Sequence, residues 1–262
     1  MIKINKVPCP QELTPQKQKE LTDRFLKDRS ATVWKQPYIK RALLESSHGK
    51  CVYCECKLEV ESKYMEVEHF QDKKTYPKEV INWDNLLPSC KRCNMFKGKF
   101  NTKVLPFINP AKMDPKDHLI LNNFRLYPIS GAGENTVDVL LLNDIEKLMT
   151  PRYDIFKTVI SRLDDIFRDT SSYIRNKEKK IKDMNRIISG LSNLMSEGTA
   201  KSEYAAFVAT VLCDSHEFQL ICEKLKAEGL WDQELQHKLN EINCICLDTD
   251  VKKAKEYQNK IM

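Results

Sequence analysis

The chain has 262 residues, of which 41% are hydrophobic and 31% are charged, and it contains only 7 glycines. This composition excludes disordered and collagen-like chains and favours a soluble, helix-rich protein of one or two domains. The apolar runs, such as residues 137–142, fall well short of the ~20 residues that a membrane-spanning helix needs. The sequence starts without the apolar core of a signal peptide, so we expect a cytoplasmic protein whose 10 cysteines are reduced.

The net charge of +6 comes from the first part of the chain. Residues 1–110 hold 21 Lys and Arg against 13 Asp and Glu, whereas residues 111–262 hold 22 against 24. A basic surface is typical of proteins that bind a polyanion such as nucleic acid, although a solvated basic surface without a ligand fits the charge equally well.

Two helices are expected in the N-terminal segment, residues 1–49. The first starts at Thr14-Pro15, because threonine can cap a helix and proline suits its first turn, and the second covers residues 38–47. Residues 50–103 differ in character, since cysteines, aromatic residues and cations are packed together there. This segment is the predicted functional core.

The second half of the chain predicts a short β region and then helices. Residues 104–143 are rich in proline and glycine and predict a loop followed by a β-hairpin, with strands at 119–127 and 136–142 around Gly131-Ala132-Gly133. Residues 144–262 carry apolar residues at helical spacing and predict a helical region, a possible docking site for a partner. The helices expected there are 144–188, 202–213, 217–228, 232–243 and 250–261.

Two Cys-x-x-Cys pairs are the strongest chemical signal in the sequence. Cys51 and Cys54 form the first pair, and Cys90 and Cys93 form the second. Each spacing aims two thiolates at one point, and four thiolates in a tetrahedron suit a structural Zn²⁺. Cys56 follows two residues after Cys54 and is an alternative fourth ligand.

The segment between the cysteine pairs predicts a catalytic group. Alternating residues up to Glu68-His69 predict a strand, and a short basic helix is expected between a capping Ser89 and Gly98. A neutral imidazole can accept a proton from water, and carboxylate and amide oxygens bind Mg²⁺ or Mn²⁺. We expect His69 to be the general base, Glu68 and Asn94 to be cation ligands, and Asn85 to clamp the loop after the histidine. Each of these residues alone has a structural alternative.

A run of cations follows on the same helix. Five basic residues fall within 13 residues that contain no acid, namely Lys91, Arg92, Lys97, Lys99 and Lys103. Beside a catalytic cation they are candidates for contacts to backbone phosphates, which carry no sequence information. The alternative is a solvated helix face.

Residues 48–103 resemble an HNH nuclease, also called a ββα-metal nuclease, through Glu68-His69, Asn85 and Asn94. The wider context, including Trp83 to Cys90, is similar to the HNH nucleases of Septu and retron-associated anti-phage systems. That resemblance implies a defence nuclease that works beside a separate ATPase subunit. The chain departs from the family where Gln71-Asp72-Lys73 replaces Arg-Pro-Lys, and where Glu68 replaces the more usual Asp.

The sequence therefore predicts an α+β protein with a zinc-stapled ββα-metal (HNH) core within a predominantly helical chain. The expected activity is metal-dependent hydrolysis of phosphodiester bonds, with DNA favoured over RNA such as tRNA. The alternatives are a non-catalytic zinc-stapled nucleic-acid-binding module and a helical adaptor for an ATPase. Gly98-Lys99 lacks the other residues of a phosphate-binding P-loop, so we expect any ATP hydrolysis to come from the partner.

Overall fold

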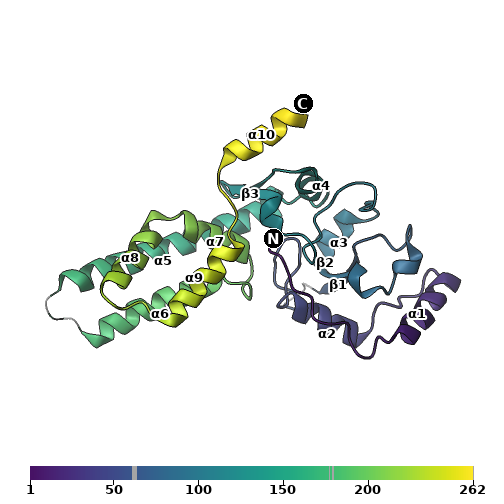
Figure 1. The fold of residues 1–262 in the computed structure, drawn as a ribbon, viewed down its shortest axis with the longest axis horizontal. Coiled ribbons are helices and arrows are strands. Elements are labelled where there is room, and N and C mark those ends of the chain that lie inside the picture. Colours follow the sequence, from purple (N-terminus) through teal and green to yellow (C-terminus); the bar gives the residue numbers. More distant parts are fainter. Residues whose placement is uncertain (61–63, 177, 179, 262) are drawn as a thin grey trace. The chain divides into compact units, whose positions relative to one another are not determined.

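The computed structural model describes residues 1–60, 64–176, 178 and 180–261. The chain divides into two compact units (Figure 1). The first comprises residues 1–119, 127–142 and the residues from Lys252 on, and the second comprises residues 120–126 and 143–251. Among the described residues, no helix combines the length and the apolar character needed to cross a membrane.

The helices and strands occur in the following order. They are α1 (Pro15–Lys27), α2 (Pro37–Ser46), β1 (Met65–His69), β2 (Leu86–Cys90), α3 (Lys91–Lys97), β3 (Leu119–Asn122), β4 (Arg125–Pro128), α4 (Gly131–Val139), α5 (Thr150–Arg175), α6 (Ile181–Glu197), α7 (Ala205–Asp214), α8 (His216–Ala227), α9 (Gln233–Ile245) and α10 (Val251–Ile261). Short 3-10 turns lie at Pro77–Glu79, Trp83–Asn85 and Pro115–Asp117, and one π turn lies at Ile145–Met149.

The predicted N-terminal helices are confirmed. The Thr14 hydroxyl accepts a hydrogen bond from the Lys17 N–H (3.2 Å) and caps α1, whose Leu21 and Phe25 side chains are buried. Helix α2 starts at Pro37 and buries its apolar face in the same unit. Loss of a cap of this kind costs about 1 kcal/mol, so α1 depends mainly on its buried face.

Strands β1 and β2 and helix α3 form the centre of the first unit. The strands are antiparallel, with His69 opposite Leu86 and Met65 opposite Cys90, and α3 begins directly after β2 and contacts both strands. Ser89 was wrong as the cap of α3, because Cys90 Sγ accepts the Cys93 N–H (3.4 Å) instead. Gly98 ends the helix as predicted, with a φ of +49° that favours glycine.

Residues 104–143 contain a β-hairpin, but its strands and its turn differ from those predicted, because Gly131-Ala132-Gly133, the expected turn, forms the start of α4. β3 pairs with β4 across a turn at Asn123 and Phe124, which both have positive φ. The expected strand at 136–142 was wrong, because this segment lies largely in helix α4. Ser130 starts that helix by accepting the Gly133 N–H (3.1 Å), and a Cβ at Gly133 would lie 2.2 Å from the His118 carbonyl oxygen.

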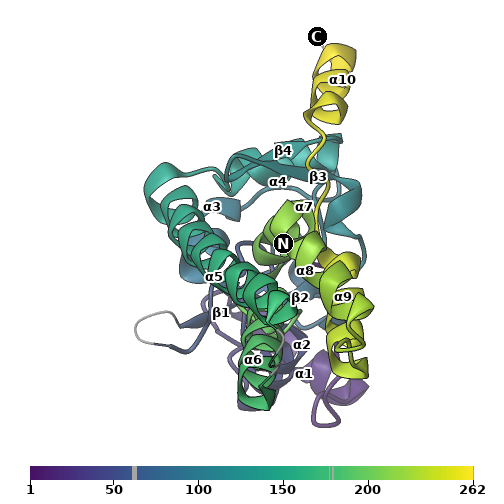
Figure 2. The same cartoon turned by 90° about the vertical axis from the view of Figure 1, so that its left-hand side faces the viewer.

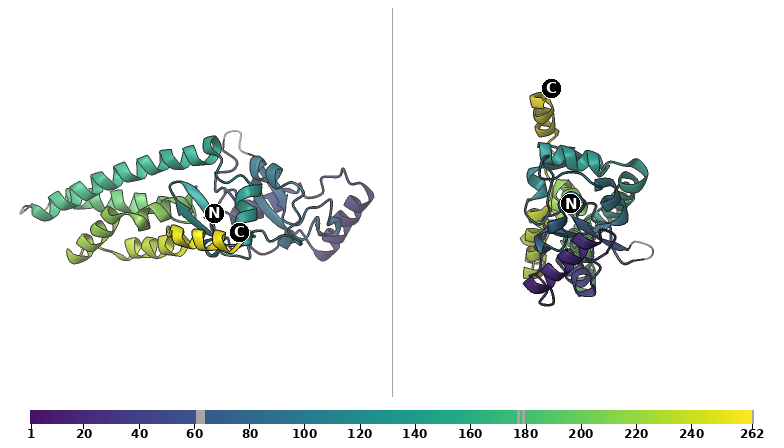
Figure 3. Two further views of the ribbon diagram at one scale, coloured as in Figure 1. Left: turned by 90° about the horizontal axis from the view of Figure 1, so that it is seen from above. Right: turned by 90° about the vertical axis from the view of Figure 1, so that its right-hand side faces the viewer.

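The second unit is a packed set of helices (Figures 2 and 3). Helix α5 contacts α6, α7 and α8, and α9 contacts α6 and α7. The long helix expected from about residue 144 toward 188, with a possible break near Thr150-Pro151, divides at two places: α5 starts at Thr150, directly after the π turn, and ends at Arg175, and α6 starts at Ile181. Lys177 and Lys179 of this stretch lie outside the described residues. The apolar stripe of α7 is buried core, as the burial of Phe207 and Leu212 shows.

Candidate active site

Two tight turns bring four cysteines together in the first unit. The Sγ atoms of Cys51, Cys54, Cys90 and Cys93 all lie within 4.8 Å of one another, and all four residues are buried. The first turn is closed by the Cys51 N–H, which donates to the Cys56 carbonyl (3.0 Å). This donor set and spacing fit a tetrahedral Zn²⁺ site. Cys56 is buried nearby but does not belong to this group of four.

His69 lies at the end of β1 and is only 4% exposed. Its Nε2–H donates to the Val80 carbonyl (3.1 Å), and its ring packs edge-to-face on Trp34 with 4.9 Å between centroids. Since a carbonyl can only accept, this bond places the proton of the neutral imidazole on Nε2 and leaves the lone pair on Nδ1. Burial, together with the charge of Lys73, lowers the pKa of His69 to about 3, so the imidazole is neutral at physiological pH.

Asn85 joins the loop after His69 to the start of β2. Its Oδ1 accepts the Gln71 N–H (2.6 Å), and its Nδ2 donates to the Gln71 and Glu79 carbonyls (both 3.0 Å). Its own carbonyl accepts the Phe70 N–H (2.9 Å). The side chain is buried and saturated with backbone partners. Through these hydrogen bonds, Asn85 fixes the backbone of the loop that follows His69.

The two carboxylates of β1 have different partners on α3. Asn94 Nδ2 donates to Glu66 Oε2, whereas the Lys97 ammonium lies 2.5 Å from Glu68 Oε1. Glu68 and Lys97 are each 2% exposed, and Lys97 Nζ also donates to the His69 carbonyl (2.9 Å). Burial raises the pKa of Glu68 to about 7, against the opposing charge of Lys97. The structure thus pairs Asn94 with Glu66, and not with the expected Glu68.

The five predicted phosphate contacts divide into three groups. Lys91, Lys99 and Lys103 are exposed. Arg92 donates to the carbonyls of Leu140 (3.0 Å) and Leu141 (2.9 Å), and its guanidinium lies over the Phe96 ring. Lys97 was wrong as a phosphate contact, because its ammonium is buried in the ion pair with Glu68.

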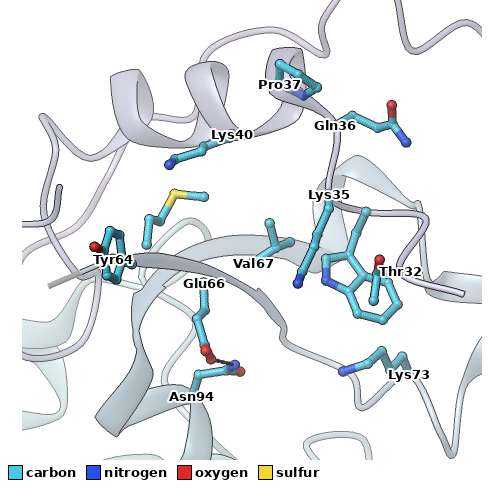
Figure 4. Close-up of a pocket in the computed structure, with 12 residues that line it drawn as sticks. Thr32, Lys35, Gln36, Pro37, Lys40, Tyr64, Glu66, Val67, Lys73 and Asn94 are labelled. Atoms are coloured by element: carbon cyan, nitrogen blue, oxygen red, sulfur yellow. Dashed lines mark hydrogen bonds between the residues drawn. The ribbon is translucent and has the colours of Figure 1, made fainter. Parts of the chain in front are cut away.

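A pocket of about 620 Å³ opens beside β1 (Figure 4). It is bordered by the Glu66–Asn94 pair and by residues of the loop before α2. The residues that line it are Thr32, Trp34, Lys35, Gln36, Pro37, Lys40, Tyr64, Met65, Glu66, Val67, Lys73 and Asn94.

Three features of this site were missed at the level of sequence. Glu66 shares the face of Glu68, since strand residues two apart point the same way, and this period could have identified it. The Val80 carbonyl and the Trp34 ring reach His69 from distant parts of the chain, 11 and 35 residues away in sequence. Neither contact can be predicted from a local sequence pattern.

Comparison with known proteins identifies the class of protein to which this site belongs. A family profile for HNH endonucleases matches residues 51–100, which contain both cysteine pairs, β1, β2 and α3. The chain therefore carries an HNH endonuclease domain.

The rest of the chain is also shared with known relatives. The chain is 42% identical over 240 residues to the Septu protein PtuB of Bacillus thuringiensis, covering 92% of this chain and 93% of that protein. A Septu protein PtuB of Bacillus mycoides (strain KBAB4) is 30% identical over 143 residues, which cover 42% of this chain and 48% of that protein. The chain belongs to the Septu PtuB family. No solved structure matches it.

Proposed function

We propose that this protein is a metal-dependent endonuclease that hydrolyses phosphodiester bonds, with His69 as general base. The observation that carries the proposal is the fixed tautomer of His69, whose Nε2–H is held by the Val80 carbonyl. The clamp formed by Asn85 on Gln71 supports it, because this clamp fixes the loop that follows the base.

In the proposed reaction, Nδ1 of His69 accepts a proton from a water molecule as the water oxygen bonds to phosphorus. The bond from phosphorus to the leaving oxygen breaks, and that oxygen is protonated by solvent. His69 is neutral and can accept the proton without first losing one. A bound Mg²⁺ or Mn²⁺ would supply stabilisation of the negative charge on the phosphate and the leaving oxygen.

We assign the catalytic cation to Glu66 and Asn94. Both side chains border the open pocket and offer the carboxylate and amide oxygens that hard cations prefer. The expected ligand Glu68 is a poorer candidate, since the Lys97 ammonium already neutralises its buried carboxylate. The structural Zn²⁺ is assigned to Cys51, Cys54, Cys90 and Cys93.

Replacing Glu66 with glutamine should therefore reduce Mg²⁺-dependent cleavage by about 100-fold or more, while the zinc content and the melting temperature stay unchanged. The physical reason is that the amide lacks the charge that holds a divalent cation. The measurement is the cleavage rate of plasmid DNA and of a structured RNA as a function of Mg²⁺ or Mn²⁺ concentration, with EDTA as the blank.

The matched control is Glu45→Gln, since Glu45 is an exposed acidic residue of the same unit that does not border the pocket beside β1. It should leave the metal dependence of cleavage unchanged. If Glu66→Gln cleaves at the wild-type rate over the whole range of metal concentrations, the assignment of the cation to Glu66 is wrong.

The exposed cations of and after α3 are assigned to the substrate backbone. Lys91, Lys99 and Lys103 are exposed residues of the same segment as Asn94, and the Lys103 ammonium lies over the Tyr76 ring. Contacts of this kind depend on salt and are not sequence-specific. DNA remains the favoured substrate, and parallel assays on DNA and RNA decide between them.

Membership of the Septu PtuB family supports a proposal for the biological setting. We propose that the protein is the cytoplasmic nuclease component of an anti-phage defence system and that it works with a separate ATPase docked through its helical regions. The high identity to a Septu protein over nearly the whole chain supports this role. The sequence has no P-loop, so the ATPase would be another chain.

A further inference from the structure

The pocket beside β1 contains the two proposed cation ligands, Glu66 and Asn94, and extends beyond them. It runs along Met65, Glu66 and Val67, and Asn94 closes one side. Trp34 lines the pocket and also packs on the His69 ring, with 4.9 Å between centroids. Its volume of about 620 Å³ falls in the range of about 300–1,000 Å³ that is typical of sites for small molecules. A group held there would lie beside Glu66 and Asn94, the proposed cation ligands, which line the same pocket.

The pocket presents cations whose charge is not fully balanced. Lys35, Lys40 and Lys73 line it, and Glu66 is the carboxylate among the lining residues. Lys40 is paired with Glu59 (2.7 Å), but within the described part of the chain the ammonium group of Lys35 has no ion pair. The Lys73 ammonium lies 4.7 Å from the centre of the Trp34 ring. Figure 4 shows the amino groups of Lys35 and Lys73 reaching toward the space beside Val67.

The same pocket offers an uncovered aromatic ring. Tyr64 is 68% exposed and lies at the end of the pocket opposite to Lys35 and Lys73 (Figure 4). Apolar surface from Met65, Val67 and Pro37 lies between the two ends. Cations at one end and an exposed ring at the other fit a ligand that is anionic at one end and flat at the other. A nucleotide has this form.

We propose that the pocket holds one unpaired nucleotide of the substrate next to the scissile phosphate, with its phosphate near Lys35 and Lys73 and its base against Tyr64. This inference rests on the proposed nuclease function and narrows its substrate to nucleic acid that is single-stranded at the cut. A base inside a duplex is stacked on both faces, whereas an unpaired base can stack on an aromatic side chain. Every base has such a face, so DNA and RNA strands both fit.

The test is a binding measurement that does not depend on cleavage. Zinc-loaded full-length protein is titrated, without added divalent cation, into fluorescent 12-nucleotide DNA and RNA strands and into the DNA duplex of the same sequence. We expect the single strands to bind at least about tenfold more tightly than the duplex. Tyr64→Ala should weaken single-strand binding about tenfold, because one stacked base is lost, whereas Tyr64→Phe should keep the wild-type affinity.

Lysine variants test the other end of the pocket. Lys35→Ala should weaken binding of the single strands, and Lys19→Ala, which removes the same charge from an exposed position on α1, should not. Equal affinity for strand and duplex would overturn the proposal, as would wild-type binding by both Tyr64→Ala and Lys35→Ala.

The same proteins are then assayed for cleavage in Mg²⁺, which separates the two proposals. A strand preference that depends on Tyr64 supports the pocket even if no cleavage occurs, and only the nuclease assignment then fails. Cleavage that is equally fast on duplex and strand, and unchanged in Tyr64→Ala, overturns the pocket and leaves the nuclease intact.

Discussion

Cys93→Ser is expected to lose the bound zinc and to unfold the first unit. Metal binding to a structural zinc site contributes about 10–16 kcal/mol in small zinc domains, which is as much as the entire stability of a typical protein of about 5–15 kcal/mol. The four thiols tie the turn at residues 51–54 to the junction of β2 and α3, so β1, which carries His69, and β2, which follows Asn85, depend on them. Zinc per chain and thermal unfolding by circular dichroism measure the effect.

Cys56→Ser is the matched control, because Cys56 is buried beside the site but is not one of the four grouped cysteines. It should retain one zinc per chain. Stoichiometric zinc in Cys93→Ser would contradict the assigned ligand set, and loss of zinc in Cys56→Ser would show that Cys56 is a ligand.

Lys97→Met is expected to lower the free energy of unfolding by about 3–5 kcal/mol, because the buried Glu68 carboxyl loses its counter-charge and must either stay charged without a partner or take up a proton. Both residues are 2% exposed, and Lys97 also holds the His69 carbonyl. Urea denaturation measures the change. Lys99→Met, at an exposed position two residues away, should change the free energy by less than about 0.5 kcal/mol.

The double variant Lys97→Met/Glu68→Gln removes both charges and should recover part of the lost stability. A buried pair replaced as a whole is far less damaging than a pair with one partner removed. The losses in free energy of unfolding of Lys97→Met and Glu68→Gln are added and compared with the loss of the double variant. If the double variant loses more than this sum, the broken ion pair does not explain the instability of Lys97→Met.

The sequence predicted the local features of the active-site unit because each is encoded by neighbouring residues. The Cys-x-x-Cys spacing fixes two turns, alternation up to His69 gives β1, and Gly98 ends α3. The predicted capping residue of α3 was wrong by one position. The Cys90 Sγ, and not the Ser89 hydroxyl, accepts the hydrogen bond that caps the helix. Short-range signals therefore placed most of the core.

The pairing of side chains across elements could not be predicted in the same way. Glu66 and Glu68 share one face of a strand, and Asn94 and Lys97, three residues apart, share one face of a helix. The sequence allows either carboxylate to meet either helix residue. The packing of α3 on β1 decides that Asn94 pairs with Glu66 and that Lys97 pairs with Glu68.

Residues 136–142 show a third limit. A short, mostly apolar segment such as this one fits a strand or a buried helix turn equally well. The choice is made by Ser130, which caps α4, and by the approach of the His118 carbonyl to Gly133. The second of these is a tertiary contact that the local sequence does not contain.

The most direct test of the nuclease assignment is the cleavage rate of His69→Ala beside wild type, on DNA and RNA in Mg²⁺, with zinc content and melting temperature measured on the same samples. His118→Ala is the control, since this histidine of the same unit bonds to Ser130, away from the site. We predict a loss of about 10²–10⁴-fold in His69→Ala with zinc retained, and none in His118→Ala. Cleavage at the wild-type rate by a folded, zinc-bound His69→Ala protein would contradict the account.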